Sequence, residues 1–309
     1  PPLARSHMGP HLASSKSPII VANGKQIEGD SIRCPYHGWR YGPDGQLDDI
    51  PYHDGPCPKS GAIKSYDVRD VMGCVMMWFD PEGGEPEYEP PMLKEWDDPS
   101  WVPWQLDHLG ELNIHPQEIL DNMADAQHLG PTHGAPCEYF ENELRGHLCI
   151  QRQGGYHQTY DAYLRTTTWY TGPGVLLSKQ QFGDVLTFEL IANTPVDDGV
   201  SKVWHAALAQ AQQVPHSEAD IAAAKEIQAG ALFAFSADFD VWAHKRPALR
   251  IMQMRNDGPF KTIRQWYGQF YDAPANAGTY SEAVDGRYYV DNLGKPGAEH
   301  SELDQGLFD

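Results

Sequence analysis

The sequence has few basic residues and no long apolar run. Only 23 of its 309 residues are Lys or Arg, against 43 Asp and Glu, so the formal net charge is −20. A charge of this sign disfavours nucleic acid and anionic membrane surfaces as partners. No stretch approaches the roughly 18 consecutive apolar residues that a membrane-spanning helix requires. We therefore expect a protein that binds neither nucleic acid nor a membrane.

Cysteines are also few, and their number is odd. The thiols are those of Cys34, Cys57, Cys74, Cys137 and Cys149. An odd, scattered set indicates a reducing compartment with metal-binding or buried thiols, not a disulfide framework. No secretory signal is visible, although the start of the sequence looks incomplete. We expect a cytoplasmic protein, long enough to bury a core without disulfides.

The composition divides the chain into an all-β first part, residues 1–100, and a second domain, residues 101–309. The first part is rich in Gly and Pro, and its short apolar runs indicate strands joined by turns at Asn23-Gly24 and Asp44-Gly45. The run "PPMLKEWDDPSWVPW" predicts a linker.

The second domain is expected to contain helices as well as strands. "HPQEILDNMADAQHLG" has helical spacing and is expected to stop at Gly130-Pro131. Residues 156–208 alternate apolar with polar residues, which predicts antiparallel strands. A long helix capped by Ser217 follows, and "KTIRQWYGQFY" predicts a strand or short helix. The polar, acidic tail after Ala275 is expected to be extended along a neighbour or mobile.

Two short motifs in the first part suit a metal. "RCPYHGWRYG" contains Cys34-x-x-His37, in which Pro35 and Gly38 form a tight turn that aims thiolate and imidazole at one point. On its own such a motif is also compatible with a turn around a buried thiol. A Rieske [2Fe-2S] centre needs a second loop, since two cysteines hold one iron and two histidines the other. "ARSHMGPHL" fits the loop pattern C-x-H-x-G-x-x-L with His7, except that Arg5 occupies the cysteine position.

The second domain carries a different metal motif, "DNMADAQHLGPTH". Asp125 and His128 are one helical turn apart, and a break at Gly130-Pro131 would let His133 fold back beside His128. Two histidines and one carboxylate on one face of an iron form the facial triad of non-haem Fe(II) oxygenases. Surface histidines beside a turn are the plainer interpretation.

The third ligand has two candidates in "FAFSADFDVWAHK". Asp238 and Asp240 lie in an otherwise apolar helix, where an unpaired carboxylate costs free energy unless it binds a partner or a metal. We favour Asp238, with Asp240 as the alternative.

Taken together, "CPYHGW", "DNMADAQHLGPTH" and "DFDVWAHK" resemble the oxygenase component of Rieske non-haem iron oxygenases. The C-terminal run "DFDVWAHKRP…DGPFKTIRQWYGQFY" most resembles the 3-ketosteroid 9α-hydroxylase oxygenases. The resemblance implies an α+β fold, with an N-terminal all-β Rieske domain followed by a helix-grip-like antiparallel sheet with flanking helices. It covers roughly residues 5–272.

The resemblance also implies cofactors and roles. His7, Cys34 and His37 would hold the Rieske cluster, and His128, His133 and Asp238 a mononuclear Fe(II). Asp125 would pass electrons from the cluster of a neighbouring subunit, since the two centres of one chain are too far apart in this family, and a homotrimer results. Asn122 would sit near the iron. Tyr163, Trp169, Leu176 and Phe233 are candidates for a substrate pocket, with ordinary core as the alternative.

The implied reaction inserts one oxygen atom of O2 into a C–H bond of a bulky hydrophobic, steroid-like substrate. The sequence has no flavin or nicotinamide fingerprint and no C-x4-C-x2-C ferredoxin loop. A separate NAD(P)H-dependent reductase or ferredoxin would therefore supply the electrons.

Arg5 is the departure from the family pattern, because a guanidinium offers no lone pair to iron. Three explanations compete: residues missing before Ser6, a substitution of the cysteine, or a vector-derived "SHM". Two other functions stay open, a Rieske oxygenase for a small aromatic or an O- or N-methyl substrate, and a non-catalytic subunit without a cluster. A structural zinc protein would leave the "DNMADAQHLGPTH" spacing unexplained.

Overall fold

The computed structural model describes residues 26–245, 248 and 250–308. This part of the chain forms two compact units. The smaller contains residues 26–69 and Val75–Glu87, and the larger contains Asp70–Cys74 and residues 88–308. None of the described helices is both long and apolar enough to cross a bilayer.

The smaller unit consists of short strands and turns. Its four-stranded antiparallel sheet follows chain order, with β1 Ile27–Glu28, β2 Ser31–Arg33, β3 Arg40–Tyr41 and β4 Leu47–Asp49. A 3-10 turn, η1 Lys59–Gly61, follows. The paired strands β5 Val68–Val71 and β6 Cys74–Met77 come next in the chain, and Asp70–Cys74 of this hairpin are counted with the larger unit. Cys34, Tyr41, Leu47 and Ile50 form a small buried core. The expected all-β character and the Asp44-Gly45 turn are confirmed; Asn23-Gly24 lies outside the described residues.

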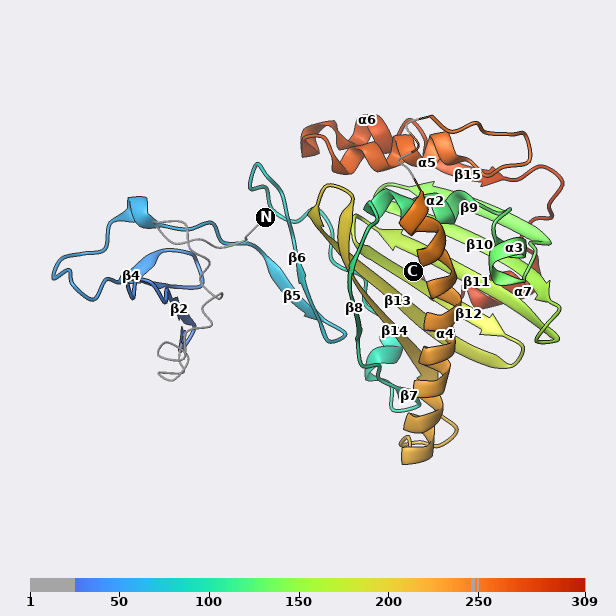
Figure 1. The fold of residues 1–309 in the computed structure, drawn as a ribbon, viewed down its shortest axis with the longest axis horizontal. Helices are drawn as coiled ribbons and strands as arrows, with labels where there is room; N and C mark the ends of the chain where they lie inside the picture. The colour runs from blue at the N-terminus through green and yellow to red at the C-terminus, as the bar shows by residue number, and fades with distance from the viewer. Residues whose placement is uncertain (1–25, 246–247, 249, 309) are drawn as a thin grey trace. The chain divides into compact units, whose positions relative to one another are not determined.

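The larger unit is built on one antiparallel sheet (Figure 1), in the order β15-β9-β10-β11-β12-β13-β14-β7, with β8 also paired to β14. Its strands are β7 Trp101–Val102, β8 Asp107–Leu112, β9 Tyr139–Arg145, β10 Leu148–His157, β11 Ala162–Thr171, β12 Val175–Phe182, β13 Val185–Asp197, β14 Val200–Gln210 and β15 Gly286–Tyr289. The strands expected over 156–208 are confirmed. β9 and β10 were not predicted from the sequence, because their many polar residues obscure the alternation of apolar and polar side chains that marks a strand.

Helices pack against this sheet. They are α2 Pro116–Ala124, α3 Leu129–His133, α4 Glu218–His244, α5 Phe260–Tyr267, α6 Ala277–Ser281 and α7 Ala298–Leu303, with 3-10 turns η2 Lys94–Asp97, η3 Gly268–Phe270 and η4 Pro274–Asn276. α4 starts as expected at Ser217, whose side chain forms a capping box with Asp220. α4 packs along β14 and lies across one face of the sheet (Figure 1).

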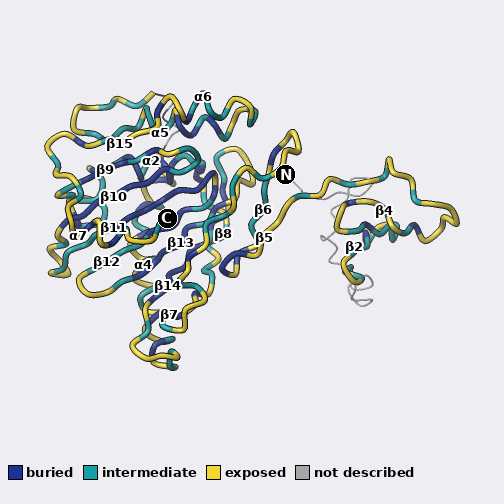
Figure 2. Tube along the Cα trace, turned by 180° about the vertical axis from the view of Figure 1, so that it is seen from behind, coloured by how far each residue is buried: buried dark blue, intermediate teal, exposed yellow. Residues whose placement is uncertain are grey.

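The two faces of the sheet are both covered. Tyr170 of β11 and Leu176 of β12 belong to the buried cluster that contains Phe235 and Trp242 of α4. Because side chains alternate along a strand, Trp169 and Leu177 point to the opposite face, where Trp169 meets Phe308 near the C-terminus. The strands are accordingly buried over much of their length (Figure 2).

Three sequence-based expectations are wrong. The first helix ends at Ala124, so the break precedes Gly130-Pro131, and Pro131 lies inside α3. Pro is tolerated there because the first turn of a helix needs no donor from its N–H. The expected linker is not exposed, since Leu93, Trp101 and Trp104 are buried in the larger unit and Trp104 donates to the Met72 carbonyl at 2.8 Å.

The tail after Ala275 is neither extended along a neighbour nor loose. β15 pairs with β9, and α7 buries Leu303 together with the polar side chain of His300. His300 of α7 is buried, with Nδ1 2.6 Å from the Tyr139 hydroxyl and Nε2 2.8 Å from that of Thr167. Arg152 of β10 donates to Asp304 at 2.5 Å. Buried polar pairs of this kind leave no periodic signal in a sequence.

Arg152→Met should destabilise the larger unit strongly. The guanidinium is buried and lies 2.7 Å from Glu141, 2.7 Å from Glu143 and 2.5 Å from Asp304. Its removal leaves Asp304 without this arginine and leaves the buried Glu141 and Glu143 with only the exposed Arg287, at 4.0 Å and 3.4 Å. We therefore expect the free energy of unfolding to fall by about 3 kcal/mol. Urea unfolding followed by circular dichroism measures the loss.

The matched control is Arg255→Met, because the Arg255–Asp291 pair is exposed. Exposed ion pairs contribute little, so the control should unfold at the wild-type urea concentration. Equal losses in the two variants would contradict a structural role for the buried network.

Candidate metal centre

His128 is positioned by a turn that Asp125 forms at the end of α2. The Asp125 side chain accepts hydrogen bonds from the backbone N–H of Gln127 at 3.0 Å and of His128 at 3.3 Å. Side-chain bonds of this type compete with the helix and end it. His128 Nδ1 lies 2.6 Å from the Asp125 carbonyl oxygen. That bond holds the proton on Nδ1 and leaves Nε2 with a lone pair for a metal.

His133 is brought back beside His128 by the short helix α3. His128 is the N-cap of α3 and His133 its last residue, and the two rings lie 5.2 Å apart between centroids. Gly134 then ends the helix with a φ of +72°, a left-handed conformation that favours glycine. The turn at Asp125, and not Gly130-Pro131, thus separates the two histidines from α2.

The carboxylate comes from the middle of α4. Asp238 Oδ2 lies 3.6 Å from His133 Nε2, and one ligand atom from each of His128, His133 and Asp238 lies within 4.8 Å of the other two. Asp238 is buried, whereas Asp240 is exposed and is absent from this cluster. Asn122 of α2 contributes a hydrogen bond to the Asp238 carboxylate. The structure therefore brings together Asn122, His128, His133 and Asp238.

The protonation states of the cluster suit metal binding. Burial lowers the pKa of both His128 and His133, so both imidazoles are neutral near pH 7, the form that coordinates a metal. Burial raises the pKa of the Asp238 carboxyl to about 6, against the opposing effects of His128 and of the Asn122 hydrogen bond. A divalent cation between the three groups would supply the positive charge that this buried carboxylate lacks.

The ligand types fit iron. Two neutral imidazoles and one carboxylate on one side of an ion leave other coordination positions open for O2 and substrate, as in non-haem Fe(II) sites. A closed structural zinc site would need a fourth protein ligand. Among the described His, Cys, Asp and Glu residues, this cluster is the one group of three or more that could hold a metal ion.

Cys34 and His37 lie on one tight turn of the smaller unit. Gly38 N–H donates to the Cys34 carbonyl at 3.0 Å, and Cys34 N–H to the Trp39 carbonyl at 2.7 Å. Gly38 has a φ of +74°, and a Cβ there would lie 3.0 Å from the Pro51 ring. Cys34 is almost fully buried. The geometry suits one half of a Rieske site; His7 and Arg5 lie outside the described residues.

Arg33 braces this turn, and no sequence motif predicted that role. Its guanidinium donates to the Gly38 carbonyl at 2.5 Å, to Glu28 at 2.6 Å and to Asp49 at 2.8 Å. The arginine thus ties the turn to β1 and β4. Its partners are scattered along the chain, so no spacing rule identifies it.

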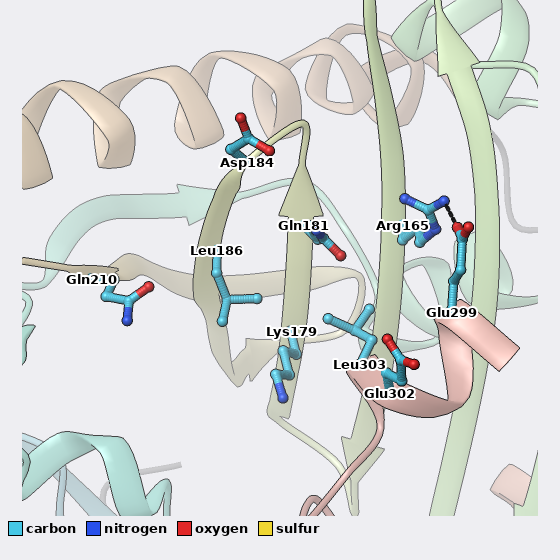
Figure 3. A pocket seen from close by; sticks show the side chains of 9 residues that line it. All are labelled: Arg165, Lys179, Gln181, Asp184, Leu186, Gln210, Glu299, Glu302 and Leu303. Atoms are coloured by element: carbon cyan, nitrogen blue, oxygen red, sulfur yellow. Dashed lines mark hydrogen bonds and ion pairs between the residues drawn. The ribbon is translucent and has the colours of Figure 1, made fainter.

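The four pocket candidates do not line the metal cluster together. Tyr163 and Trp169 point to the sheet face opposite α4, Leu176 is buried in the core, and Phe233 is exposed on α4. A pocket of about 600 Å³ also lies on the opposite face, between the sheet and α7. Figure 3 shows Arg165, Lys179 and Gln181 on its strands, with Arg165 paired to Glu299 of α7.

Two protein-family models match this chain. Residues 77–271 match the family model described as the 3-ketosteroid 9alpha-hydroxylase C-terminal domain, and residues 3–67 match the Rieske [2Fe-2S] domain. A 3-ketosteroid-9-alpha-monooxygenase oxygenase component of Rhodococcus rhodochrous is 27% identical over 85% of this chain and 72% of its own length.

Two further comparisons concern a sterol enzyme and a solved structure. Cholesterol 7-desaturase of Bombyx mori is 26% identical, covering 85% of this chain and 59% of its own length. NdmA of Pseudomonas putida CBB5, solved as a mutant with caffeine, superposes with a TM-score of 0.63 at 14% identity, over 94% of this chain and 84% of that one. The last likeness supports the fold.

Asp238→Asn should remove one iron per chain from the purified protein. The amide cannot supply the anionic oxygen that completes the set of two imidazoles and one carboxylate around the iron. Acid-labile sulfide belongs to the cluster of the other unit, so its amount should not change. Asp240→Asn, on the same helix but exposed, is the matched control and should keep the wild-type iron. Iron and sulfide analysis of both variants measures this. A loss of iron in the Asp240 variant alone would mean that the third ligand was assigned to the wrong aspartate.

Proposed function

The chain belongs to the 3-ketosteroid 9α-hydroxylase family of Rieske non-haem iron monooxygenases, and from that membership we propose that it hydroxylates a bulky, steroid-like substrate. The observation that carries the proposal is the group His128, His133 and Asp238 within a region that matches this family over residues 77–271. Two relatives whose names refer to steroids or cholesterol support the substrate class.

The smaller unit would hold the Rieske cluster and the larger unit the mononuclear iron. Cys34 and His37 would bind the cluster with His7, and the fourth ligand is the one that Arg5 cannot provide. When bound, the cluster supplies single electrons and the mononuclear iron activates O2. The electrons would come from a separate NAD(P)H-dependent reductase or ferredoxin. The five thiols are all free, which suits the cytoplasm that we propose as the location.

The chain's own residues prepare the iron site in three ways. The Asp125 carbonyl fixes the His128 tautomer, so that Nε2 faces the ion. Asn122 orients the Asp238 carboxylate by a hydrogen bond. Ile119, Leu120 and Met123 of α2 and Phe235 of α4 are buried in one apolar cluster, which limits water near the site. These contacts hold the ligands in place before O2 and substrate arrive.

Asp125 would carry electrons between subunits. Its carboxylate lies 3.9 Å from His128 Nδ1, and about a third of its side chain is exposed. Asp125 thus lies next to the candidate metal ligand His128 and is also accessible to a partner subunit. We propose that a histidine ligand of a neighbouring subunit's cluster docks there, in a head-to-tail homotrimer.

Metal and sulfide content tests the proposed cofactors. About three irons and two acid-labile sulfides per chain, with a Rieske visible spectrum, are expected if the cluster assembles. One iron without sulfide would mean that Arg5 replaces a ligand and that the chain is a subunit without a cluster. Zinc in place of iron would rule out the oxygenase.

Asp125→Asn should abolish reductase-driven hydroxylation of a 3-ketosteroid. The amide keeps the turn, because its oxygen still accepts the two backbone bonds, but it cannot hold the negative charge proposed for the electron bridge. Iron content and oligomeric state should stay at wild-type values, and they serve as controls. Turnover at the wild-type rate would show that electrons reach the iron by another route.

The same assay decides between substrate classes. Oxygen uptake and product formation with a 3-ketosteroid are expected to rise together. Turnover of a small aromatic acid or an O- or N-methyl compound, with none of the steroid, would support the alternative substrate class.

A further inference from the structure

A chain of hydrogen-bonded polar side chains crosses the interior of the larger unit. His205 of β14 is fully buried, with Nδ1 3.1 Å from Asp107 Oδ2 and Nε2 3.0 Å from Glu189 Oε1. The Asp107 side chain, on β8, is 35% exposed, whereas Glu189 of β13 is buried. The imidazole therefore joins a carboxylate that water reaches to a carboxylate that is enclosed.

The two carboxylates keep a proton on this imidazole. Burial acts to lower the pKa of His205, but the hydrogen bonds and charges of Glu189 and Asp107 outweigh it and raise the pKa above its usual value. The neighbours from α4 are uncharged, namely the Phe235 ring at 6.1 Å and Gln228, which donates to Asp107 at 2.9 Å. A protonated ring donates from both nitrogens, whereas a neutral ring would turn a lone pair toward one carboxylate.

The inner end of the chain lies on the side of the metal candidates. Glu189 shares a sheet face with Ile191, which packs in the same cluster as Phe235 of α4. Its second oxygen accepts a hydrogen bond from Gln180 Nε2 at 2.5 Å. The charge of Glu189 acts to raise the pKa of His133 and of Asp238.

The outer end is tied to α4, the helix that carries Asp238. Besides Asp107, Gln228 Nε2 donates to the Gln105 carbonyl at 2.8 Å, and its Oε1 accepts from the Ala207 N–H at 3.0 Å. Gln228 thus fixes one edge of the chain between the helix and the sheet. Every polar member from Gln180 to Gln228 has a partner, as an organised buried network requires.

We propose that Asp107, His205 and Glu189 form a proton path from solvent to the interior, on the sheet face that α4 covers. The path rests on the proposed function, since monooxygenation converts R–H, O2, two electrons and two protons into R–OH and water. The reductase supplies the electrons, whereas the protons must cross the protein to an enclosed site. A buried histidine between an exposed and an enclosed carboxylate is suited to that transfer.

One pass moves one proton. His205 releases its Nε2 proton to Glu189, which becomes a neutral carboxylic acid, while Nδ1–H stays on Asp107. The bond broken is N–H and the bond formed is O–H, so no electron is transferred. Glu189 yields the proton to the reaction. His205 regains its proton when the side chain turns about both Cα–Cβ and Cβ–Cγ, which brings the bare Nε2 to Asp107, where water restores the proton. Two passes serve one turnover.

The first test asks whether the carboxylates hold the proton. Hydrogen exchange at Cε1 of His205, followed by mass spectrometry on the full chain as purified, gives the protonation midpoint. We expect a wild-type midpoint above the ordinary value of about 6.5, and a fall of about one unit in Asp107→Asn. Glu111→Gln, which removes an exposed carboxylate of the same strand, should leave the midpoint unchanged. A wild-type midpoint at or below the ordinary value would overturn the proposal.

The second test separates proton delivery from a structural ion pair. Oxygen uptake driven by the reductase with a 3-ketosteroid is compared in H2O and D2O. Asp107→Asn should slow uptake by about tenfold or more and raise the H2O/D2O rate ratio, with the melting temperature kept. Asp107→Glu, which retains a carboxylate, should restore both the rate and the ratio.

The two ways of failing are distinct. A lower melting temperature in Asp107→Asn with an unchanged rate ratio would overturn the path and leave a structural contact. An absence of oxygen uptake in the wild type would instead contradict the proposed function. Uptake in the wild type that Asp107→Asn leaves unaltered would overturn the path while the function stands.

Discussion

The catalytic unit depends on one buried carboxylate. Asp238 lies in α4 among residues such as Phe235 and Trp242, and burial raises its pKa to about 6. An ionised carboxylate in such surroundings needs positive charge or hydrogen bonds. Asn122 supplies one hydrogen bond, and His133 lies 3.6 Å away. α2, α3 and α4 surround this carboxylate without placing a positive charge beside it, and a divalent metal would supply that charge.

The sheet face that α4 covers also carries a buried polar network. Glu189 and His205 are polar residues on a face that an ordinary core would fill with apolar side chains, and both are fully engaged in hydrogen bonds. Buried polar networks cost free energy unless every member is satisfied. Their presence on the α4 side of the sheet, and not on a solvated face, favours a role in the chemistry of the site over a role in stability alone.

Much of the site could be predicted because its residues lie close in sequence. The spacing of Asn122, Asp125, His128 and His133 predicted a group on one short segment, and a carboxylate in an apolar helix pointed to Asp238. The three metal candidates lie together in the structure, and their binding of iron stays a prediction. The position of the helix break could not be predicted, since a side-chain bond of Asp125 ends α2, while Pro131 fits the first turn of α3.

The unpredicted parts depend on contacts between distant residues. The tail after Ala275 is held by His300 and Asp304, whose partners are more than a hundred positions away. Arg33 braces the Cys34 turn through scattered acids, and the alternation over 156–208 did not reveal that both sheet faces are covered.

The most direct test of the central claim is diffraction from crystals of the purified protein at wavelengths on both sides of the iron absorption edge. The account predicts an anomalous difference peak bounded by His128, His133 and Asp238, which vanishes below the edge. A peak there that persists below the iron edge and follows the zinc edge, or density for water alone, would contradict it.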